Sequence, residues 1–160
     1  MAGQVVSFFI FVQKTLKHLK NQGQDIDLII ATSSRLMTAC LAAFVARRAT
    51  AKLHLDIRDL FVFNIQNILG TIPRLCLMSL LKKIERLTFE QADSISVVSP
   101  AFVPHIQKIV PKVPIWTATN GIDPEFINLC PSAKGKNKVP TILYAGNIGD
   151  GQALHRVLPF

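Results

Sequence analysis

The sequence predicts an α/β fold built on a Rossmann-like, doubly wound parallel sheet. Apolar segments of strand length alternate four times with amphipathic segments of helical spacing, which is the pattern of such folds. Ile26–Thr32 is rich in Ile and Leu, as expected for a parallel strand that is buried on both faces. A length of 160 residues is sufficient to bury a substantial core.

The first helix is expected at Val5–Lys20, with apolar residues at helical spacing and lysines on the opposite side. A basic amphipathic helix can pack on a sheet or lie on a membrane surface, and the sequence leaves both interpretations open. After the strand Ile26–Thr32, Ser33 or Ser34 is expected to cap a helix rich in Ala and Leu.

The second strand, Lys52–Phe61, is expected to continue into a loop that carries Asp56, Arg58 and Asp59. The strand, helix and strand up to this point form one unit, for which a right-handed crossover is expected.

The helix between the first two strands is expected to carry Arg47 and Arg48 at its carboxyl end, where positive charges interact favourably with the helix dipole. Three further elements follow the pattern of the first unit. A long helix is expected at Ile72–Ala92, a third strand at Asp93–Pro100, and a short helix at Pro100–Val110, with proline at its first position.

A fourth strand is expected at Val113–Thr119, followed by Asn120 and Gly121, which suit a backbone with positive φ. The polar segment PSAKGKNKVP, bracketed by prolines, predicts a linker at residues 133–138. The linker divides the chain into a domain over residues 1–132 and the start of another over 139–160. The second part contains AGNIGDG, a glycine-rich turn between a predicted strand and a predicted helix.

The formal net charge of +8 comes from scattered basic residues rather than from long basic runs. The single Trp and the single Tyr lie in apolar, strand-like segments, so no aromatic platform for nucleic acid is expected. Anionic lipid headgroups or phosphorylated substrates are the expected partners of this charge. Three widely spaced cysteines and four histidines lack the spacing of metal ligands, so no metal is expected.

The longest nearly apolar run, Val5–Val12, is far shorter than the roughly 20 residues that span a bilayer. No cleavable leader pattern accompanies it. We therefore expect a cytoplasmic protein. Peripheral association with the inner face of the plasma membrane is compatible with this location.

Ligands of open parallel sheets bind outside the carboxyl ends of the strands, so the polar residues there are the candidates for a site. These candidates are Thr32, Ser33, Ser34, Arg58, Asp59, Ser99, the run Asn120–Asp123 and the loop Gly146–Gly151. Asp59 has three open roles: a base, an acceptor for a substrate hydroxyl, or a salt-bridge partner of Arg58.

The glycines of the loop are spaced G-x-x-G-x-G, which is neither the dinucleotide order nor a P-loop. Small residues at a helix start still let backbone N–H groups approach an anion, although a tight turn without a ligand is the alternative.

In their order and spacing, the segments DIRDLF, ERLTFEQADSISVVSP, TNGIDPEF and ILYAGNIGDGQALH resemble the family-4 glycosyltransferases of GT-B fold. The resemblance is closest to the WbuB-like bacterial branch, which builds O-antigen or capsular polysaccharide, and it covers Ile26–Pro159. It implies two Rossmann-like domains with a catalytic cleft between them. The chain would contain the later half of the first domain and the start of the second.

The resemblance implies transfer of a sugar from a nucleotide-sugar donor, a UDP-sugar, to a glycan or lipid-linked acceptor, with retention and without a metal or other cofactor. Many relatives carry His-Asp where this chain has Arg58-Asp59, so the role of the histidine is not carried over. The implied catalytic candidates are Arg58 and Asp59. The implied donor- or substrate-binding candidates are Ser99, Asn120, Gly121, Asp123, Gly146, Asn147 and Gly149.

The family's basic pair for the diphosphate and its paired glutamates would lie beyond Phe160, and its opening strand before Met1. We therefore expect no transferase activity from the 160-residue chain alone, and an unpaired apolar edge at the strand Ile26–Thr32. The alternative function is that of a non-catalytic α/β remnant or binding module with a basic, membrane-facing surface.

Overall fold

The computed structural model describes residues 2–22, 25–33, 35–65, 71–127, 143–146 and 154–156. The chain divides into two compact units, Met1–Gly121 and Ile122–Phe160. The predicted linker, residues 133–138, lies outside the described residues, so the predicted domain boundaries stay a prediction.

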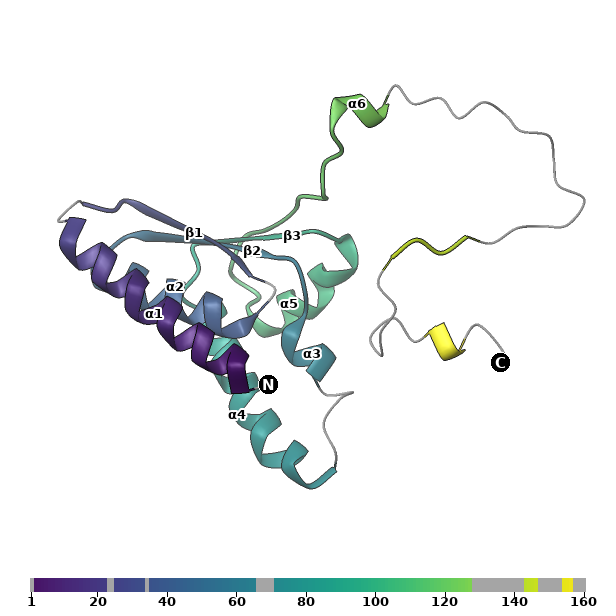
Figure 1. Ribbon diagram of the computed structural model, residues 1–160, viewed down its shortest axis with the longest axis horizontal. Helices are drawn as coiled ribbons and strands as arrows, with labels where there is room; N and C mark the ends of the chain where they lie inside the picture. The colour runs from purple at the N-terminus through teal and green to yellow at the C-terminus, as the bar shows by residue number, and fades with distance from the viewer. Residues whose placement is uncertain are drawn as a thin grey trace, which may run out of the picture. The chain divides into compact units, whose positions relative to one another are not determined.

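The first unit alternates helices and strands, which confirms the predicted α/β, Rossmann-like class (Figure 1). Its elements are α1 (Ala2–Gln22), β1 (Leu28–Ser33), α2 (Leu36–Ala49), β2 (Lys52–Ile57), α3 (Phe61–Ile65), α4 (Thr71–Phe89), β3 (Ser94–Val97), η1 (Pro100–Phe102), α5 (Val103–Ile109) and β4 (Ile115–Thr117). The described part of the second unit contains α6 (Pro124–Ile127) and η3 (Leu154–Arg156). Leu143–Gly146 is not a strand, although one was predicted there.

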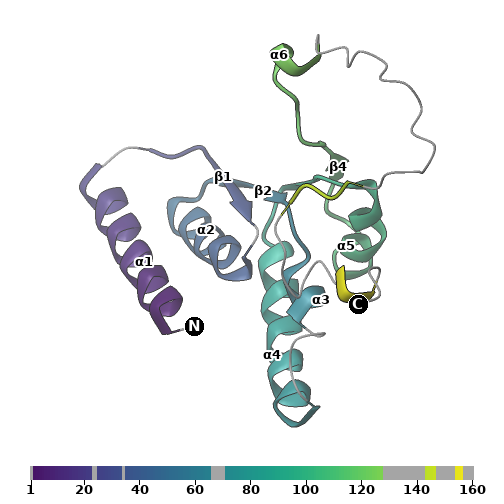
Figure 2. The same ribbon diagram turned by 45° about the vertical axis from the view of Figure 1, so that its right-hand side comes forward.

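The four strands form one parallel sheet in the order β1-β2-β3-β4. Right-handed crossovers that always step in the same direction place every connecting helix on the same face. Figures 1 and 2 accordingly show α2, α4 and α5 together on one side of the sheet. A doubly wound sheet would need a reversal of strand order. The described sheet has none, so it is wound in one direction only.

The strand β1 differs from its prediction, because it is buried on one face only. Ala31 is buried against the helices, whereas Leu28 and Ile30 are more than half exposed on the opposite face. β1 also forms an edge of the sheet, as was expected for this strand. No helix of the described first unit covers the face that carries Leu28 and Ile30 (Figure 2), so an apolar strand sequence here does not lead to two-sided burial.

The main core lies between the helices and the covered face of the sheet. In β2, Leu53, Leu55 and Ile57 alternate with more exposed residues and point into this core. The side of α2 that faces them presents small side chains, which allow the helix backbone to approach the sheet closely. These side chains are Ala39, Ala42, Ala43 and Ala46.

The start of α2 was predicted wrongly. Arg35, not a serine, is its N-cap, and it makes no side-chain capping hydrogen bond. Ser33 remains in β1, where it pairs with Ile57; Ser34 lies outside the described residues. The predicted cations Arg47 and Arg48 do lie in the last turn of α2.

Helix α2 ends at Ala49, and its C-cap Thr50 adopts a left-handed conformation with φ 55° and ψ 29°. Glycine usually occupies such a position, because a Cβ atom makes it unfavourable. No helix in the described part of the chain combines the length and the apolar character that a bilayer crossing requires.

Candidate functional site

A row of polar side chains crosses the uncovered face of the sheet. Residues 53, 55 and 57 point into the core, so His54 and Asp56 of β2 point to the other face. In β3, Ser94 pairs with His54 and Ser96 pairs with Asp56, so all four side chains share that face.

These four residues form a hydrogen-bonded chain. His54 Nδ1 lies 2.7 Å from Ser94 Oγ, and His54 Nε2 lies 3.1 Å from Ser96 Oγ. Ser96 donates its hydroxyl hydrogen to Asp56 Oδ1 at 2.8 Å. Ser96 can therefore only accept from His54, which assigns the proton of the neutral imidazole to Nε2 and makes Ser94 the donor to Nδ1.

Arg58 extends this network to the carboxyl edge of the sheet. Its Nε donates to Asp56 Oδ2 at 2.9 Å, and its Nη1 donates to Asn120 Oδ1 at 2.6 Å. Arg58 follows β2 and Asn120 follows β4, so the arginine joins the ends of two strands that are not neighbours in the sheet. Its side chain is still about half exposed, which leaves guanidinium surface for a ligand.

An indole ring borders the network. Trp116 pairs with Ser96 and therefore lies on the same face. Its ring centroid is 6.3 Å from that of His54, and the residue is 55% exposed. On the other side of the row, Ile30 of β1 pairs with His54. The polar row is thus flanked by exposed apolar side chains.

Two of the predicted site residues, Arg58 and Asn120, are brought together, although they are far apart in the chain. Ser99 has a structural contact: its hydroxyl accepts a hydrogen bond from Ala101 N at 3.3 Å, as the N-cap of η1. Asp59 is exposed and lines a small cavity together with Glu85.

Glu85 is almost completely buried on α4. Burial raises the pKa of its carboxyl group to about 7, and the nearby Lys82 only partly opposes this effect. The carboxyl groups of Glu85 and Asp59 therefore differ in environment, since one is buried and the other is exposed.

The backbone conformation expected at Asn120 and Gly121 is absent. Among the described non-glycine residues only Thr50 has a positive φ, and Gly121 also lies outside the left-handed region. Residues 118–123 have no regular structure, so the chain passes from β4 to α6 without the expected turn. Asp123 belongs to the second unit, where its carbonyl oxygen accepts from Phe126 N at 2.9 Å.

Of the three residues predicted in the glycine-rich loop, only Gly146 is described. A Cβ atom at this position would lie 2.9 Å from the hydroxyl oxygen of Tyr144, so the two residues approach closely. Asn147 and Gly149 lie outside the described residues. The donor-binding role of this loop stays a prediction.

Four members of the network were missed as site residues. Asp56 was placed in the loop but lies within β2, His54 was considered only as a metal ligand, and Ser94 and Ser96 were not considered. The segments KLHLDI and SISV do contain the signal, because polar residues occupy every second position. Alternation of this kind predicts one polar face, whereas the search was restricted to residues past the strand ends.

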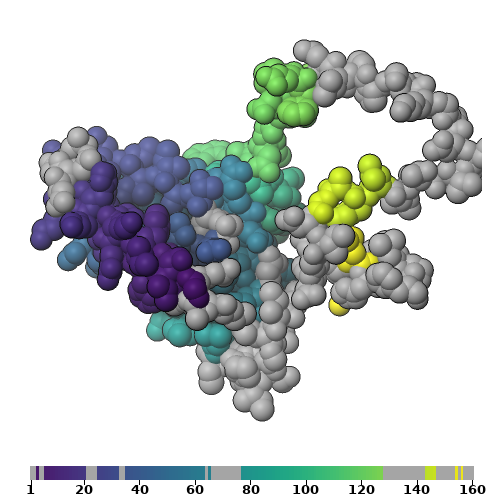
Figure 3. Space-filling view, viewed as in Figure 1, coloured from purple at the N-terminus to yellow at the C-terminus, as the bar shows by residue number. Residues whose placement is uncertain are grey.

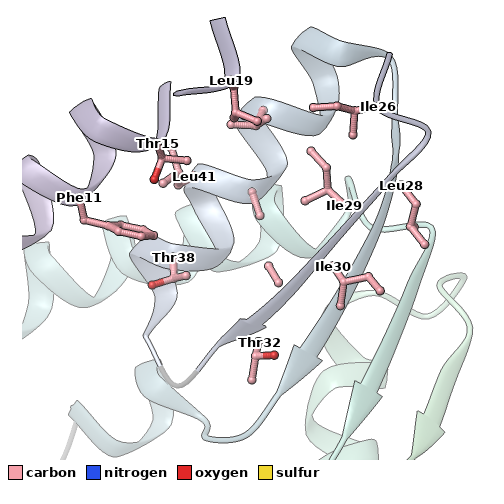
Figure 4. A pocket seen from close by; sticks show the side chains of 13 residues that line it. Phe11, Thr15, Leu19, Ile26, Leu28, Ile29, Ile30, Thr32, Thr38 and Leu41 are labelled. Atoms are coloured by element: carbon pink, nitrogen blue, oxygen red, sulfur yellow. The ribbon is translucent and has the colours of Figure 1, made fainter. Parts of the chain in front are cut away.

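A separate apolar groove of about 490 Å³ lies between α1, β1 and α2 (Figure 4). Phe11, Thr15 and Leu19 of α1 form one wall, and Ile29 of β1 and Leu41 of α2 contribute to the others. Within the described residues, no group of three His, Cys, Asp or Glu side chains is arranged to hold a metal ion.

Comparison with protein-family models, with curated proteins and with solved structures gave no match for this chain. The resemblance to glycosyltransferases therefore rests on the sequence motifs alone.

Proposed function

We propose that this chain supplies the acceptor-side part of a glycosyltransferase site, in which a sugar passes from a nucleotide-sugar donor to a glycan or lipid-linked acceptor. The observation that carries the proposal is the hydrogen bond of 2.6 Å between Arg58 and Asn120. These residues come from DIRDLF and TNGIDPEF, two of the segments that carry the family resemblance. They meet at the carboxyl edge of a parallel sheet, which is where ligands of such sheets bind.

Arg58 has the chemistry that this role requires. A guanidinium group binds phosphate oxygens through parallel N–H donors, and it keeps its charge at any physiological pH. Positive charge that is already in position can therefore bind the diphosphate of a lipid-linked acceptor. Arg58 is about half exposed, so part of the guanidinium remains accessible beside its contacts with Asp56 and Asn120.

The polar row on the sheet would position this arginine. Asp56 binds Nε of Arg58, and Ser96 binds the other carboxylate oxygen of Asp56. His54 in turn contacts Ser96, so the orientation of Arg58 depends on a chain of side chains that the sheet holds in register. In this proposal the donor is a UDP-sugar, bound by the loop that contains Gly146, and no cofactor takes part.

The proposal can be tested by titrating the ¹⁵N-labelled 160-residue protein with two probes, inorganic pyrophosphate and farnesyl-diphospho-N-acetylglucosamine. The glycosylated probe should shift the amide signals of residues 58–60 and 118–121. Arg58→Ala should weaken its binding about 10-fold or more, since a hydrogen bond to a charged group contributes roughly 1.5–3 kcal/mol.

Lys112→Ala is the matched control, because Lys112 is an exposed cation that precedes β4 and so lies at the amino edge of the sheet. This variant should bind the glycosylated probe as the unmodified protein does. Equal affinity for pyrophosphate and for the glycosylated probe would reject an acceptor site in favour of a simple anion-binding module. Binding that is insensitive to Arg58→Ala would reject the site altogether.

A further inference from the structure

The outward side of α1 carries an unusual group of large apolar side chains. At 100° per residue, the half-buried residues of α1 fall on one side, which faces the apolar groove beside β1 and α2. The first half of the helix exposes four large apolar residues away from, or at the margin of, that half-buried side. They are Val6 at 57%, Phe9 at 62%, Ile10 at 47% and Phe11 at 49% exposure.

The second half of α1 is different, because its exposed residues are mostly basic. Lys14, Lys17, His18 and Lys20 are all exposed there, and the whole of Ala2–Gln22 contains no acidic residue. The outward side of α1 is therefore apolar at its amino end and basic at its carboxyl end. Figure 3 shows α1, in purple, at the surface of the molecule.

We propose that α1 docks the protein on an anionic lipid bilayer. The apolar end would enter the boundary between headgroups and acyl chains, and the lysines would contact the headgroup phosphates. Lysine suits this position because its long aliphatic stem can lie along the apolar region while the ammonium group stays at the phosphates. The half-buried side of α1 meanwhile faces the groove beside β1 and α2.

The charge distribution favours a lipid surface over a second copy of the chain. Two copies related by a two-fold axis would bring the basic ends of two α1 helices into one interface without any carboxylate from α1 to pair them. An anionic bilayer instead offers an apolar layer and a layer of negative charge to the same helix. Phe11 also lines the groove beside α1, so the apolar surface continues past the helix itself.

This inference is independent of the proposed transfer reaction, because none of the residues of α1 belongs to the Arg58 network. The test is sedimentation of the purified 160-residue protein with vesicles of pure phosphatidylcholine or of phosphatidylcholine and phosphatidylglycerol in a 3:1 ratio. Binding should be strong only to the anionic vesicles. Raising the salt concentration from 50 to 300 mM NaCl should weaken it about 10-fold, through screening of the lysines.

Two variants address the two ends of the helix. The double variant Phe9→Ser/Ile10→Ser should reduce binding to anionic vesicles about 10-fold at either salt concentration. The triple variant Lys14→Glu/Lys17→Glu/Lys20→Glu should abolish the preference for anionic lipid. All five side chains are exposed, so both variants should keep the circular dichroism spectrum and thermal transition of the unmodified protein.

Matched controls make the same chemical changes elsewhere. Phe126→Ser/Ile127→Ser removes two equally exposed apolar residues of α6, and Lys83→Glu/Lys108→Glu/Lys112→Glu makes the same change in net charge outside α1. Both should bind anionic vesicles nearly as the unmodified protein does. The proposal is overturned if these controls lose binding as much as the α1 variants do, or if no vesicle sediments the protein. A dimer in light scattering that Phe9→Ser/Ile10→Ser dissociates would assign the apolar end to a second copy instead.

Discussion

Asp56 and Arg58, two residues apart in the chain, are joined by a hydrogen bond of 2.9 Å between Oδ2 and Nε. The spacing of two places both side chains on the same face of an extended chain. Asp56 also accepts from Ser96, so one carboxylate connects the face of the sheet with its carboxyl edge. The position of Arg58 therefore depends on a strand interior and not only on its own loop.

Replacing Asp56 should lower stability. In Asp56→Ala the nearly buried hydroxyl of Ser96 loses its acceptor and Arg58 loses its ion pair, so we expect a loss of about 1–3 kcal/mol in the free energy of unfolding. Urea denaturation monitored by Trp116 fluorescence measures this change. Asp56→Asn keeps an oxygen for Ser96 and should lose less.

A double-mutant cycle separates the contact from the individual side chains. Asp56→Ala and Ser96→Ala together should cost less than the sum of the two single changes, with a coupling of about 0.5–1.5 kcal/mol. Strict additivity would show that the hydrogen bond at 2.8 Å contributes nothing to stability.

The pH dependence of stability should contain a contribution from Glu85. Because burial raises the pKa of this carboxyl group to about 7 from its ordinary value of 4.5, the folded state holds the proton more tightly than the unfolded state does. The contribution of Glu85 to the free energy of unfolding is therefore greatest below pH 4.5 and is lost as the pH rises through 7. Glu85→Gln should match the unmodified protein near pH 5 and exceed it by about 2–3 kcal/mol at pH 8.

Urea denaturation at pH 5, 6, 7 and 8 measures the difference between Glu85→Gln and the unmodified protein. Glu90→Gln is the control, since Glu90 is exposed and forms a surface ion pair with Arg86 at 2.8 Å in the same region. Its effect should stay within about 0.5 kcal/mol at every pH. A constant offset for Glu85→Gln across this range would contradict the expected titration.

His105 should act in the opposite direction. Burial, followed by the charges of Lys108 and Lys82, lowers the pKa of its imidazole, and within the described residues its buried Nε2 has no hydrogen-bond partner. Its ring also packs edge to face on Phe63, at 5.8 Å between centroids. Protonation therefore favours the unfolded state, and stability is lost as the pH falls below the unfolded value of 6.5.

The difference between His105→Leu and the unmodified protein should grow in favour of the variant between pH 7 and pH 5. Thermal unfolding over this range measures it. Lys108→Gln removes one of the charges that oppose protonation, so it should reduce the acid-dependent loss without abolishing it. The same pH profile for all three proteins would contradict a titrating His105.

Thr50 offers a site where glycine should be stabilising. Its φ of 55° is unfavourable for a residue with a Cβ atom, so Thr50→Gly should raise the free energy of unfolding by about 0.5–1 kcal/mol. Ala49→Gly, one residue earlier, places glycine inside the helix and should lower it by a similar amount. Urea denaturation distinguishes the two, and a loss of stability in both would contradict the argument.

Local patterns predicted the alternation of elements well, because helical and strand periodicities are properties of each segment. The helix at Thr71–Phe89 and the strands at Lys52–Ile57 and Ser94–Val97 lie within their predicted ranges to within a few residues. The one-sided burial of β1, which leaves Leu28 and Ile30 exposed, could not be predicted in this way. It depends on whether a second layer covers the sheet, and a strand sequence does not encode that.

The candidate site was predicted in part for a related reason. Parallel strands end at one edge, so the topology alone placed Arg58 and Asn120 among the candidates at that edge, although their contact was not predicted. The positions of His54, Asp56 and Ser96 depend on the register between β2 and β3, which the sequence does not specify. Ser99 was a reasonable candidate by position, but a local hydrogen bond to the backbone of η1 accounts for its hydroxyl.

The order β1-β2-β3-β4 has a consequence for the way the chain folds. Each strand pairs with the one synthesised just before it, across a single intervening helical segment or two. Among the four described strands none pairs with a distant part of the sequence, so the entropy lost in closing each connection is modest. These four strands can therefore be added one at a time, in the order β1 to β4, as the polypeptide leaves the ribosome.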